Sequence, residues 1–316
     1  MSWNDFLDIV NNNQRFLISS HLSMDGDSVG SQVAMMWYLQ SHGKDVEIYN
    51  HDPVPRKFNF LGKTKNIKNK RPDTQFDVLV VLDCSNLHRL GWDVDDIAPV
   101  MINIDHHRDN TQFGAVNIVD NKAAATGEII YRFFKEYEIS FPEYVAEALY
   151  AAIMTDTGGF RFSNTNSRIL RICASLSDKG ADCSSIYERV YASHAPQALL
   201  LQARIWSTLC YHLDGKVCCM EMPLSLLNEL NAVYSDSEGM ADYTITAEGV
   251  EVGVMVKYDE NESHFSLRSK GNIDVGKIAQ KIPGGGGHFS AAGCTITEPF
   301  EKAFPYMLDI LRQELG

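Results

Sequence analysis

One short segment of this chain joins a carboxylate to two imidazoles directly after a mostly apolar run. Residues 100–104 form that run, and Asp105, His106 and His107 follow it. Proteins built from alternating strands and helices commonly place their chemistry at the carboxyl ends of strands. Neighbouring side chains of an extended segment point to opposite faces. We therefore expect one histidine to bind a metal ion and the other to face a substrate, with Asp105 orienting an imidazole.

A second cluster follows the strand-like residues 15–20 and precedes a segment with helical character. His21, Asp25 and Asp27 supply one imidazole and two carboxylates within this short loop. These donors suit Mn²⁺ or Mg²⁺ better than a metal that prefers thiolates. The alternative is that the aspartates cap a turn and a helix, while the histidine is an ordinary polar residue. Three such residues at this spacing favour the metal site.

Two more aspartates lie at the ends of apolar segments. Asp83 ends the β-branched run of residues 76–82, and Asp156 follows the apolar helical segment of residues 144–154. Either aspartate alone could be a helix cap or a turn residue. The glycine pair at residues 158–159 predicts that the helix stops and the chain turns at this carboxylate.

Together the clusters could bring four carboxylates and two imidazoles into one pocket. Four unpaired carboxylates would repel one another and would be costly to remove from water. Two divalent cations would resolve this repulsion, and ions about 3.5–4 Å apart can clamp the attacking and leaving oxygens of a phosphoryl displacement. One carboxylate would bridge both ions, and a bridging hydroxide would be the nucleophile. The candidate metal ligands are His21, Asp25, Asp27, Asp83, His106 and Asp156.

A glycine-rich cluster near the C-terminus points to anion binding. Consecutive glycines expose backbone N–H groups that can surround a phosphate, and a nearby arginine suits bidentate contact with it. A flexible glycine linker is the alternative, but this run lies between a predicted helix and a predicted strand. The candidate substrate-binding residues are Arg268, Ser269, Lys270, Gly285, Gly286, Gly287 and His288.

The elements that must position these residues alternate between strands and helices over the first part of the chain. Such alternation predicts an α/β domain with a mostly parallel sheet and helices on both faces. After about residue 185 the pattern changes to that of a smaller α+β domain. We predict a catalytic domain over residues 1–190, a helical connector over residues 191–212 and a substrate-binding domain over residues 213–316. The predicted strands are residues 15–20, 45–49, 76–82, 101–104 and 115–119, and the predicted helices are residues 28–41, 127–137, 144–154 and 167–179.

The composition is typical of a globular protein and limits the partners. The 316 residues are 45% hydrophobic, with no apolar run long enough to span a membrane and no signal peptide at the N-terminus. Seven cysteines without a C-x-x-C pair favour reduced thiols, so we expect a cytoplasmic protein. The net charge of −13 repels long polyanions, although residues 263–288 carry a local charge of +3. We expect neither membranes nor long duplex nucleic acids among its partners.

These clusters, in this order along nearly the whole chain, resemble the DHH phosphoesterases, which are named for the triplet seen at Asp105. The Arg268 segment and the glycine run resemble the DHH-associated C-terminal domain. The resemblance implies a hydrolase that uses two Mn²⁺ ions, for which Mg²⁺ or Co²⁺ could substitute. The chain length is most similar to the branch that degrades very short RNAs (nano-RNases) and dephosphorylates 3′-phosphoadenosine 5′-phosphate (pAp). A homodimer is compatible with this size.

The resemblance also implies roles for individual residues. His107 would face the scissile phosphate as a stabiliser or proton donor, and Asp105 would lie behind it. Asp83 would be the carboxylate that both ions share. The implied ligands of one ion are His21, Asp25 and Asp83, and those of the other ion are Asp27, Asp83, His106 and Asp156. The implied contacts of the terminal phosphate or nucleotide are Arg268, Gly286 and His288.

Three other activities are consistent with parts of this pattern. A phosphodiesterase of linear dinucleotides would use the same residues. An inorganic pyrophosphatase would share the N-terminal architecture, but Arg268 and the glycine run favour a nucleotide substrate. A non-catalytic nucleotide-binding regulator would have lost ligands, whereas every expected ligand is present in this sequence.

Overall fold

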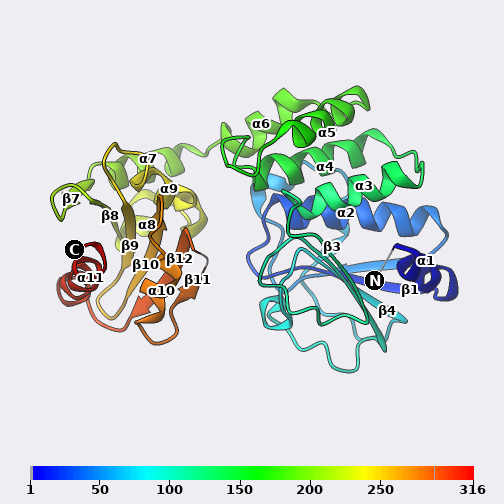
Figure 1. Cartoon of the computed structure of the whole chain (residues 1–316), viewed down its shortest axis with the longest axis horizontal. Helices are drawn as coiled ribbons and strands as arrows, with labels where there is room; N and C mark the ends of the chain where they lie inside the picture. The colour runs from blue at the N-terminus through cyan, green and yellow to red at the C-terminus, as the bar shows by residue number, and fades with distance from the viewer. Residues whose placement is uncertain (1–2, 288) are drawn as a thin grey trace. The chain divides into compact units, whose positions relative to one another are not determined.

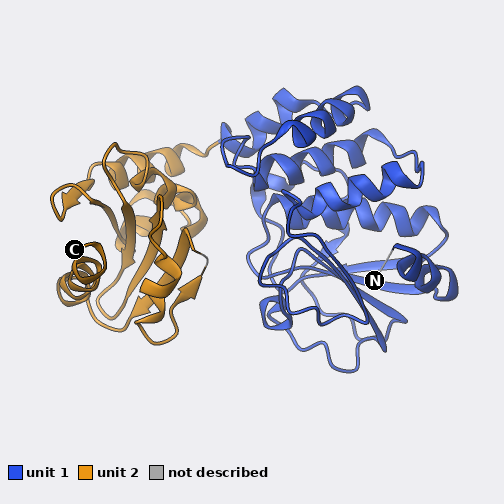
Figure 2. Ribbon diagram, in the orientation of Figure 1, with its two compact units in different colours: residues 1–193 blue, residues 194–316 orange. Residues whose placement is uncertain are grey.

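The computed structural model describes residues 3–287 and 289–316 of the chain. The chain divides into two compact units, residues 1–193 and residues 194–316 (Figure 2). The predicted division into domains of residues 1–190 and 213–316, with a connector between them, stays a prediction. Within the described residues, no helix combines the length and the apolar character that crossing a membrane requires.

The first unit is built on a parallel six-stranded sheet, which confirms the predicted fold class (Figure 1). The strand order is β3-β2-β1-β4-β5-β6, so the chain extends the sheet first on one side of β1 and then on the other. Ligands of such sheets bind at the carboxyl edge, where the strand order reverses. The strands are β1 (Arg15–Ser19), β2 (Asp45–Tyr49), β3 (Ile67–Lys68), β4 (Val78–Leu82), β5 (Val100–Asp105) and β6 (Val116–Val119).

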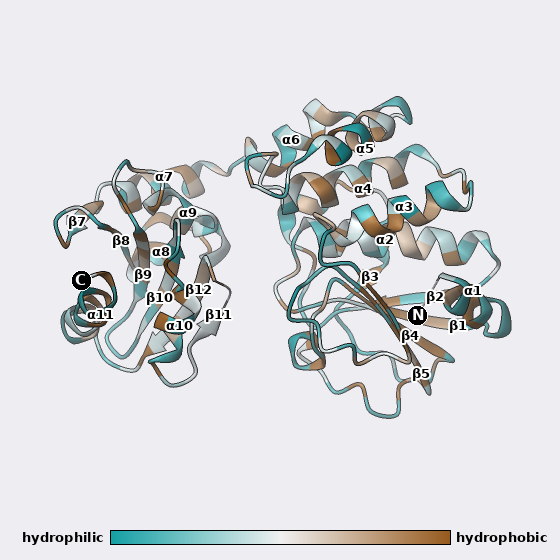
Figure 3. Cartoon of the chain, in the orientation of Figure 1, coloured by the Kyte–Doolittle hydropathy of each residue, from teal (hydrophilic) through white to brown (hydrophobic). Residues whose placement is uncertain are grey.

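The two faces of this sheet are covered differently. Every residue of β4 is buried, as its uninterrupted apolar run predicts, and the central strands are hydrophobic along their length (Figure 3). Val80 faces the core that the α-helices share, whereas Val81 faces a second core formed with residues 84–98. A short 3-10 helix, η3 (Leu87–Leu90), and loops form the layer on that second face, so the prediction of helices on both faces holds for the α-helices on the first face alone.

The α-helices of the first unit pack on the first face. Trp3 and Phe6 of α1 join this core, although the sequence analysis predicted no helix there. Close approach of α2 to α4 requires a glycine, because a Cβ on Gly30 would lie 2.2 Å from the carbonyl oxygen of Ala148. The helices are α1 (Trp3–Asn12), α2 (Gly26–Ser41), α3 (Thr126–Glu136), α4 (Glu143–Asp156), α5 (Ser167–Asp178) and α6 (Cys183–Tyr191).

The second unit is a mixed sheet between two layers of helices, which confirms the predicted smaller α+β fold. Its strand order is β11-β12-β10-β9-β8-β7, with only β8 and β9 parallel among the described pairs. Helices α10 and α11 pack on one face, and α7, α8 and α9 on the other. The strands are β7 (Cys210–His212), β8 (Val217–Pro223), β9 (Val252–Tyr258), β10 (Ser263–Ser269), β11 (Gly286–Gly287) and β12 (Ala291–Ile296). The helices are α7 (Pro196–Trp206), α8 (Ser225–Leu230), α9 (Met240–Thr244), α10 (Val275–Gln280) and α11 (Phe300–Leu315).

Candidate active site

The carboxyl edge of the first sheet collects the aspartates and histidines that the sequence singled out. His21 follows β1, Asp83 follows β4, and His106 follows β5, and these three strands are neighbours in the sheet. The N-terminus of α2 and the C-terminus of α4 bring the remaining candidates to the same edge. The fold therefore brings together the six candidate ligands, which are up to 135 positions apart in the chain (156 − 21).

Asp83 lies at the centre of the cluster. Its Oδ2 lies 3.4 Å from Nε2 of His21, and its Oδ1 lies 3.5 Å from Nε2 of His106. The hydroxyl of Thr126 donates a hydrogen bond of 3.2 Å to the same Oδ1. Asp83 is 1% exposed, so its charge must be balanced by neighbouring groups.

The start of α2 holds the two aspartates of the first loop in different ways. Asp25 is the N-cap of α2 and accepts a hydrogen bond of 3.0 Å from the backbone N–H of Ser28, so the capping alternative is correct for this residue. The same carboxylate also lies 3.9 Å from Nε2 of His21. Asp25 can therefore cap the helix and face a metal ion with the same carboxylate.

Asp27 is buried against the N-terminus of α3. The backbone N–H groups of Thr126 and Gly127 donate hydrogen bonds of 2.6 and 2.8 Å to its two carboxylate oxygens. The positive end of the helix dipole adds to this stabilisation of the ionised carboxylate. A Cβ on Gly127 would lie 2.6 Å from Cβ of Ala152, so the glycine allows α3 to approach α4 closely. No motif in the sequence revealed Gly127 as part of the site.

The two histidines of the triplet lie side by side, because the segment does not stay extended beyond Asp105. Strand β5 ends at Asp105, so the alternation of an extended strand no longer applies to His106 and His107. Their ring centroids are 4.6 Å apart. Nε2 of His106 lies 3.2 Å from Asp156, whereas Nδ1 of His107 lies 2.7 Å from Asp105.

Asp156 is the last residue of α4, which continues beyond the helical segment of residues 144–154 predicted from the sequence. The helix thus stops at this carboxylate, as the glycine pair predicts. The chain turns immediately afterwards, at Gly158 and Gly159, which both have positive φ. The side-chain amide of Asn164 then donates to the backbone carbonyls of Asp156 and Ala124, at 3.0 and 3.3 Å. Asn164 thus joins two site segments, and nothing in the sequence singled it out.

Burial and mutual repulsion shape the electrostatics of the carboxylates. Burial raises the pKa of the Asp27 carboxyl well above its ordinary value, and the charges of Asp83 and Asp156 raise it further. Burial also raises the pKa of Asp156 to about 7, although His106 opposes this change. Burial likewise disfavours ionisation of Asp83, but hydrogen bonds with His106 and His21 outweigh it and hold the pKa of Asp83 well below its ordinary value.

The imidazoles carry the compensating positive charge. Burial lowers the pKa of His21, but Asp83 and Asp25 outweigh burial and raise it to about 9. Burial also opposes protonation of His107, and the bond to Asp105 raises its pKa above the ordinary value. The side-chain amide of Asn110 donates to the other oxygen of Asp105 at 2.6 Å, which fixes this orienting carboxylate. Protons on the histidines therefore balance the buried carboxylates.

Among the residues that the structure describes, three sets of side chains could each hold a metal ion, because their ligand atoms lie within 4.8 Å of one another. Carboxylate oxygens and imidazole nitrogens are the donors that hard and borderline divalent cations prefer. A cation would also neutralise the buried carboxylates of Asp27 and Asp83. The site therefore fits divalent metal ions. The sets are His21, Asp25 and Asp83; Asp27, His106 and Asp156; and Asp83, His106 and His107.

The substrate-binding candidates of the second unit lie on β10, β11 and the adjoining turns. Nε of Arg268 donates a hydrogen bond of 2.7 Å to Asp242, so its guanidinium is already oriented by a carboxylate. Gly286 and Gly287 form β11, so half of the predicted glycine loop is a short strand paired with β12. A Cβ on Gly285 would lie 2.2 Å from the carbonyl oxygen of Ala279. His288 lies outside the described residues.

The hydroxyl and ammonium groups next to Arg268 are engaged locally. Ser269 donates a hydrogen bond of 2.7 Å to the carbonyl of Ile273, and Lys270 reaches the carbonyl of Ala247 at 3.4 Å. Both contacts are compatible with a structural role in the turn after β10.

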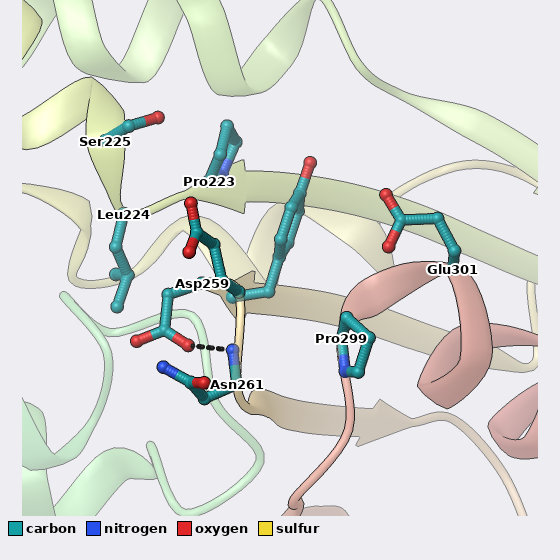
Figure 4. A pocket seen from close by; sticks show the side chains of 9 residues that line it. Pro223, Leu224, Ser225, Asp259, Asn261, Pro299 and Glu301 are labelled. Atoms are coloured by element: carbon teal, nitrogen blue, oxygen red, sulfur yellow. Dashed lines mark hydrogen bonds between the residues drawn. The ribbon is translucent and has the colours of Figure 1, made fainter.

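A cavity of about 650 Å³ lies elsewhere in the second unit, at the carboxyl ends of β8 and β9 (Figure 4). Asp259 and Glu301 line it from two different elements, together with Tyr258. Asp259 also accepts a hydrogen bond of 2.7 Å from the backbone N–H of Asn261. None of the predicted site residues lines this cavity.

Comparisons with known proteins connect this geometry to a family. Residues 15–153 match the DHH family, N-terminal domain, and residues 214–316 match the DHHA1 domain. NrnA of Thermus thermophilus, named a bifunctional oligoribonuclease and PAP phosphatase, is 31% identical, and the match covers 94% of this chain and 89% of that protein. The chain belongs to the DHH phosphoesterase family. The resemblance inferred from the sequence is thereby confirmed.

One further relative and two solved structures are also similar to this chain. The Bacillus subtilis protein of the same name is 23% identical over 89% of this chain and 88% of its own length. The crystal structure of an exopolyphosphatase-related protein from Bacteroides fragilis superposes with a TM-score of 0.93 at 25% identity, covering 98% of this chain and 95% of that one. The structure of Thermus thermophilus RecJ in complex with Mn²⁺ has a TM-score of 0.51 at 12% identity, covers 97% of this chain and 53% of that one, and supports the fold alone.

Proposed function

We propose that this DHH phosphoesterase hydrolyses very short oligoribonucleotides and pAp, and that it uses two divalent cations, with Mn²⁺ as the preferred ion. One observation carries this proposal: the two oxygens of Asp83 face two different groups of ligands. Oδ2 faces His21, and Oδ1 faces His106. A carboxylate in this position can be shared by two ions.

The two ions would lie on either side of Asp83. His21 and Asp25 would complete one set of ligands, and Nδ1 of His21 already contacts the carbonyl of Leu22 at 2.6 Å, which leaves Nε2 for the ion. The other set would be Asp27, His106 and Asp156, which the structure brings within 4.8 Å of one another. When bound, such ions supply an activated water and stabilise charge on the phosphate oxygens.

The side chains around the ligands would orient the reaction. Asp105 contacts Nδ1 of His107 at 2.7 Å and orients this ring, which would contact a phosphate or a leaving oxygen. The raised pKa of His107 favours its protonated form, which suits a hydrogen-bond donor or proton donor. We propose that His107 and Asp105 fulfil this role together. The backbone N–H groups of Thr126 and Gly127 would orient the Asp27 carboxylate toward the ion.

Charge and relatedness favour a small substrate. The chain has a net charge of −13, which disfavours long polyanions and long duplexes. The 31% identical relative is named an oligoribonuclease and PAP phosphatase. We propose that Arg268, Gly286 and His288 of the second unit bind the terminal phosphate or the nucleotide, together with the neighbouring residues of both segments.

Product analysis tests the proposal. The substrates are a labelled RNA ladder of two to five nucleotides, pAp and inorganic pyrophosphate, each with Mn²⁺. We expect mononucleotides from the short RNAs, and adenosine monophosphate with inorganic phosphate from pAp. Hydrolysis of pyrophosphate alone would instead identify a pyrophosphatase. Binding of the nucleotides without any turnover would identify a regulator. Cleavage confined to the dinucleotide would restrict the activity to linear dinucleotides.

A further inference from the structure

Two cysteines of the second unit lie directly opposite each other on neighbouring strands. Strands β7 and β8 are antiparallel, and Cys210 is the register partner of Cys219. Sγ of Cys210 lies 3.9 Å from the backbone carbonyl oxygen of Cys219, so this sulfur leans across the strand pair. Opposed residues of antiparallel strands have Cα atoms about 4.5–5.5 Å apart, which lies within the range that disulfides span. Their position allows a bond between the two sulfurs.

An imidazole lies against the first of these sulfurs. Nε2 of His212 is 3.3 Å from Sγ of Cys210, two residues along the same strand and therefore on the same face of the sheet. The His212 ring packs against Phe304 of α11, with centroids 5.3 Å apart, which holds the imidazole in place. A cationic or N–H-donating imidazole favours the thiolate form of a neighbouring cysteine.

The two thiols differ in access and in acidity. Cys210 is partly exposed on β7, the edge strand of the described sheet, whereas Cys219 is 2% exposed. A hydrogen bond from Cys219 and, after it, the contact with His212 lower the pKa of Cys210 to about 6, while burial and, more weakly, the negative charge of Glu221 oppose this change. The same hydrogen bond, together with burial, raises the pKa of Cys219. The pair thus consists of an accessible thiolate and a buried thiol.

We propose that Cys210 and Cys219 form an oxidisable pair that reacts with hydrogen peroxide or a small organic hydroperoxide. The Cys210 thiolate attacks one peroxide oxygen, so an S–O bond forms, the O–O bond breaks, and hydroxide (or alkoxide) leaves and takes up a proton. Sγ of Cys219 then attacks the sulfenic acid, forming the S–S bond as the S–O bond breaks. The hydroxyl departs as water with the Cys219 proton. The two thiols lose two electrons in total, and the peroxide gains them.

The other described cysteines lack this combination of features. Burial raises the pKa of Cys84 and Cys173 to about 12 and that of Cys294 to about 11, which disfavours their thiolates. Cys183 in the first unit is partly exposed like Cys210, and it serves as the internal reference. Neither β7 nor β8 contributes a candidate ligand, so this pair stands independently of the proposed hydrolase activity.

Alkylation of the reduced full-length chain measures the reactivity of each thiol. With iodoacetamide at pH 7, we expect Cys210 to react at least about tenfold faster than Cys183, because most of Cys210 is thiolate at that pH. The rate at Cys210 should fall as the pH is lowered through 6. The substitution His212→Ala should slow alkylation of Cys210 and leave Cys183 unchanged. Equal rates at Cys210 and Cys183 in the wild-type chain would overturn the proposal.

Mass spectrometry after peroxide treatment measures the bond itself. The chain is treated with one equivalent of hydrogen peroxide, the remaining thiols are capped, and the protein is digested. We expect a pair of peptides linked through Cys210 and Cys219, which dithiothreitol separates. Cys210→Ser should abolish the bond, whereas Cys218→Ser, on the opposite face of β8, should retain it. Sulfinic acid at Cys210 without the bond, or a bond to another cysteine, would refute the pairing. The wild-type measurement decides the question even if a variant fails to fold.

Discussion

Asp83 combines a central position among the ligands with an uncommon backbone conformation. Its φ of +54° lies in the left-handed region, which costs most residues with a Cβ roughly 1–2 kcal/mol. Asparagine and aspartate tolerate this region better, because their short side chains bond locally. Strained backbone at functional sites persists only where the surroundings enforce it. The turn after β4 thus directs Asp83 toward His21 and His106 at a conformational cost.

The backbone of Asp83 leads to a prediction about stability. In metal-free protein, Asp83→Asn should have a free energy of unfolding about 1 kcal/mol higher than that of Asp83→Ala, because alanine tolerates a positive φ less well. Urea denaturation measures this difference. The same two substitutions at exposed Asp73, where φ is not positive, should differ by less than about 0.5 kcal/mol. Equal stabilities of the two Asp83 variants would contradict the role of the backbone.

Protonation of the metal-free site leads to a second prediction at the same scale. His21, with its pKa raised to about 9, carries a proton at pH 7, and Asp156, with its pKa near 7, is partly protonated. Metal ligands bind in their deprotonated forms, so Mn²⁺ binding must release protons. Mn²⁺ affinity should therefore fall as the pH is lowered from 8 to 6.

Calorimetric titration of Mn²⁺ at pH 7, in two buffers with different ionisation enthalpies, measures the proton release. We expect the binding heats to differ by an amount that corresponds to at least one proton per chain. Identical heats in the two buffers would show that the site binds its metal without losing protons.

At the residue scale, residue type and position were sufficient to predict that the candidate metal ligands lie together. They were not sufficient to predict contacts that depend on the path of the backbone. Asp83 and Asp156 could be selected because each ends an apolar segment. Asp105 was expected to orient an imidazole, and its contact with His107 rather than with His106 depends on β5 ending at Asp105. Asn164 acts through one side-chain amide and two carbonyls, and its sequence surroundings resemble those of any polar loop.

At the scale of elements, the N-terminus of α3 and the loop after α4 fix the ligands. Asn164 joins the carbonyls of Ala124 and Asp156, whereas Asn166 caps α5 by accepting from the backbone N–H groups of two of its residues. Groups that orient metal ligands typically change metal affinity about 10–100-fold when they are removed. Two asparagines of one loop therefore have separable roles.

These roles can be measured with one pair of variants. Asn164→Ala should raise the Mn²⁺ concentration for half-maximal turnover by about tenfold or more. Asn166→Ala should lower the free energy of unfolding by about 1 kcal/mol through loss of the helix cap and leave the Mn²⁺ requirement unchanged. Metal titrations of turnover together with urea denaturation give both quantities. An unchanged Mn²⁺ requirement in Asn164→Ala would remove Asn164 from the site.

The glycine segment allows a matched pair of substitutions in the second unit. A Cβ on Gly286 would meet nothing within 4 Å, whereas one on Gly285 would collide with the carbonyl of Ala279. Gly286→Ala should therefore leave the stability unchanged and raise KM for short RNA several-fold, since its methyl group would obstruct a phosphate. Gly285→Ala should lower the free energy of unfolding by about 1–3 kcal/mol. If Gly286→Ala leaves KM unchanged, the glycine segment does not contact substrate.

Element types were easier to predict than element ends. The continuous apolar run of β4 indicated a strand buried on both faces, and it is one. Within the helical connector predicted over residues 191–212, α7 stops at Trp206, and Cys210 already belongs to β7. The layer on the second face of the first sheet is formed by residues 84–98, which follow an irregular path. No hydrophobic periodicity in the sequence reveals such a path.

At the scale of the whole molecule, net charge and the division into two units bear on the choice of substrate. A charge of −13 opposes binding of long nucleic acids, while the second unit carries a local positive segment within residues 263–288. The catalytic candidates belong to the first unit and the phosphate-binding candidates to the second. A substrate that contacts both sets of residues must present a scissile phosphodiester and a terminal phosphate or nucleotide.

The central claim is that two cations sharing Asp83 hydrolyse very short RNA. The most direct test compares the Mn²⁺-dependent cleavage of a labelled RNA trinucleotide by the wild-type chain and by Asp83→Asn, which keeps the backbone preference of Asp83. We predict that the wild-type chain releases mononucleotides and that Asp83→Asn is slower by at least about a thousandfold, since a shared ligand contributes several kcal/mol of transition-state stabilisation. Cleavage by a folded Asp83→Asn variant within tenfold of the wild-type rate would contradict the claim.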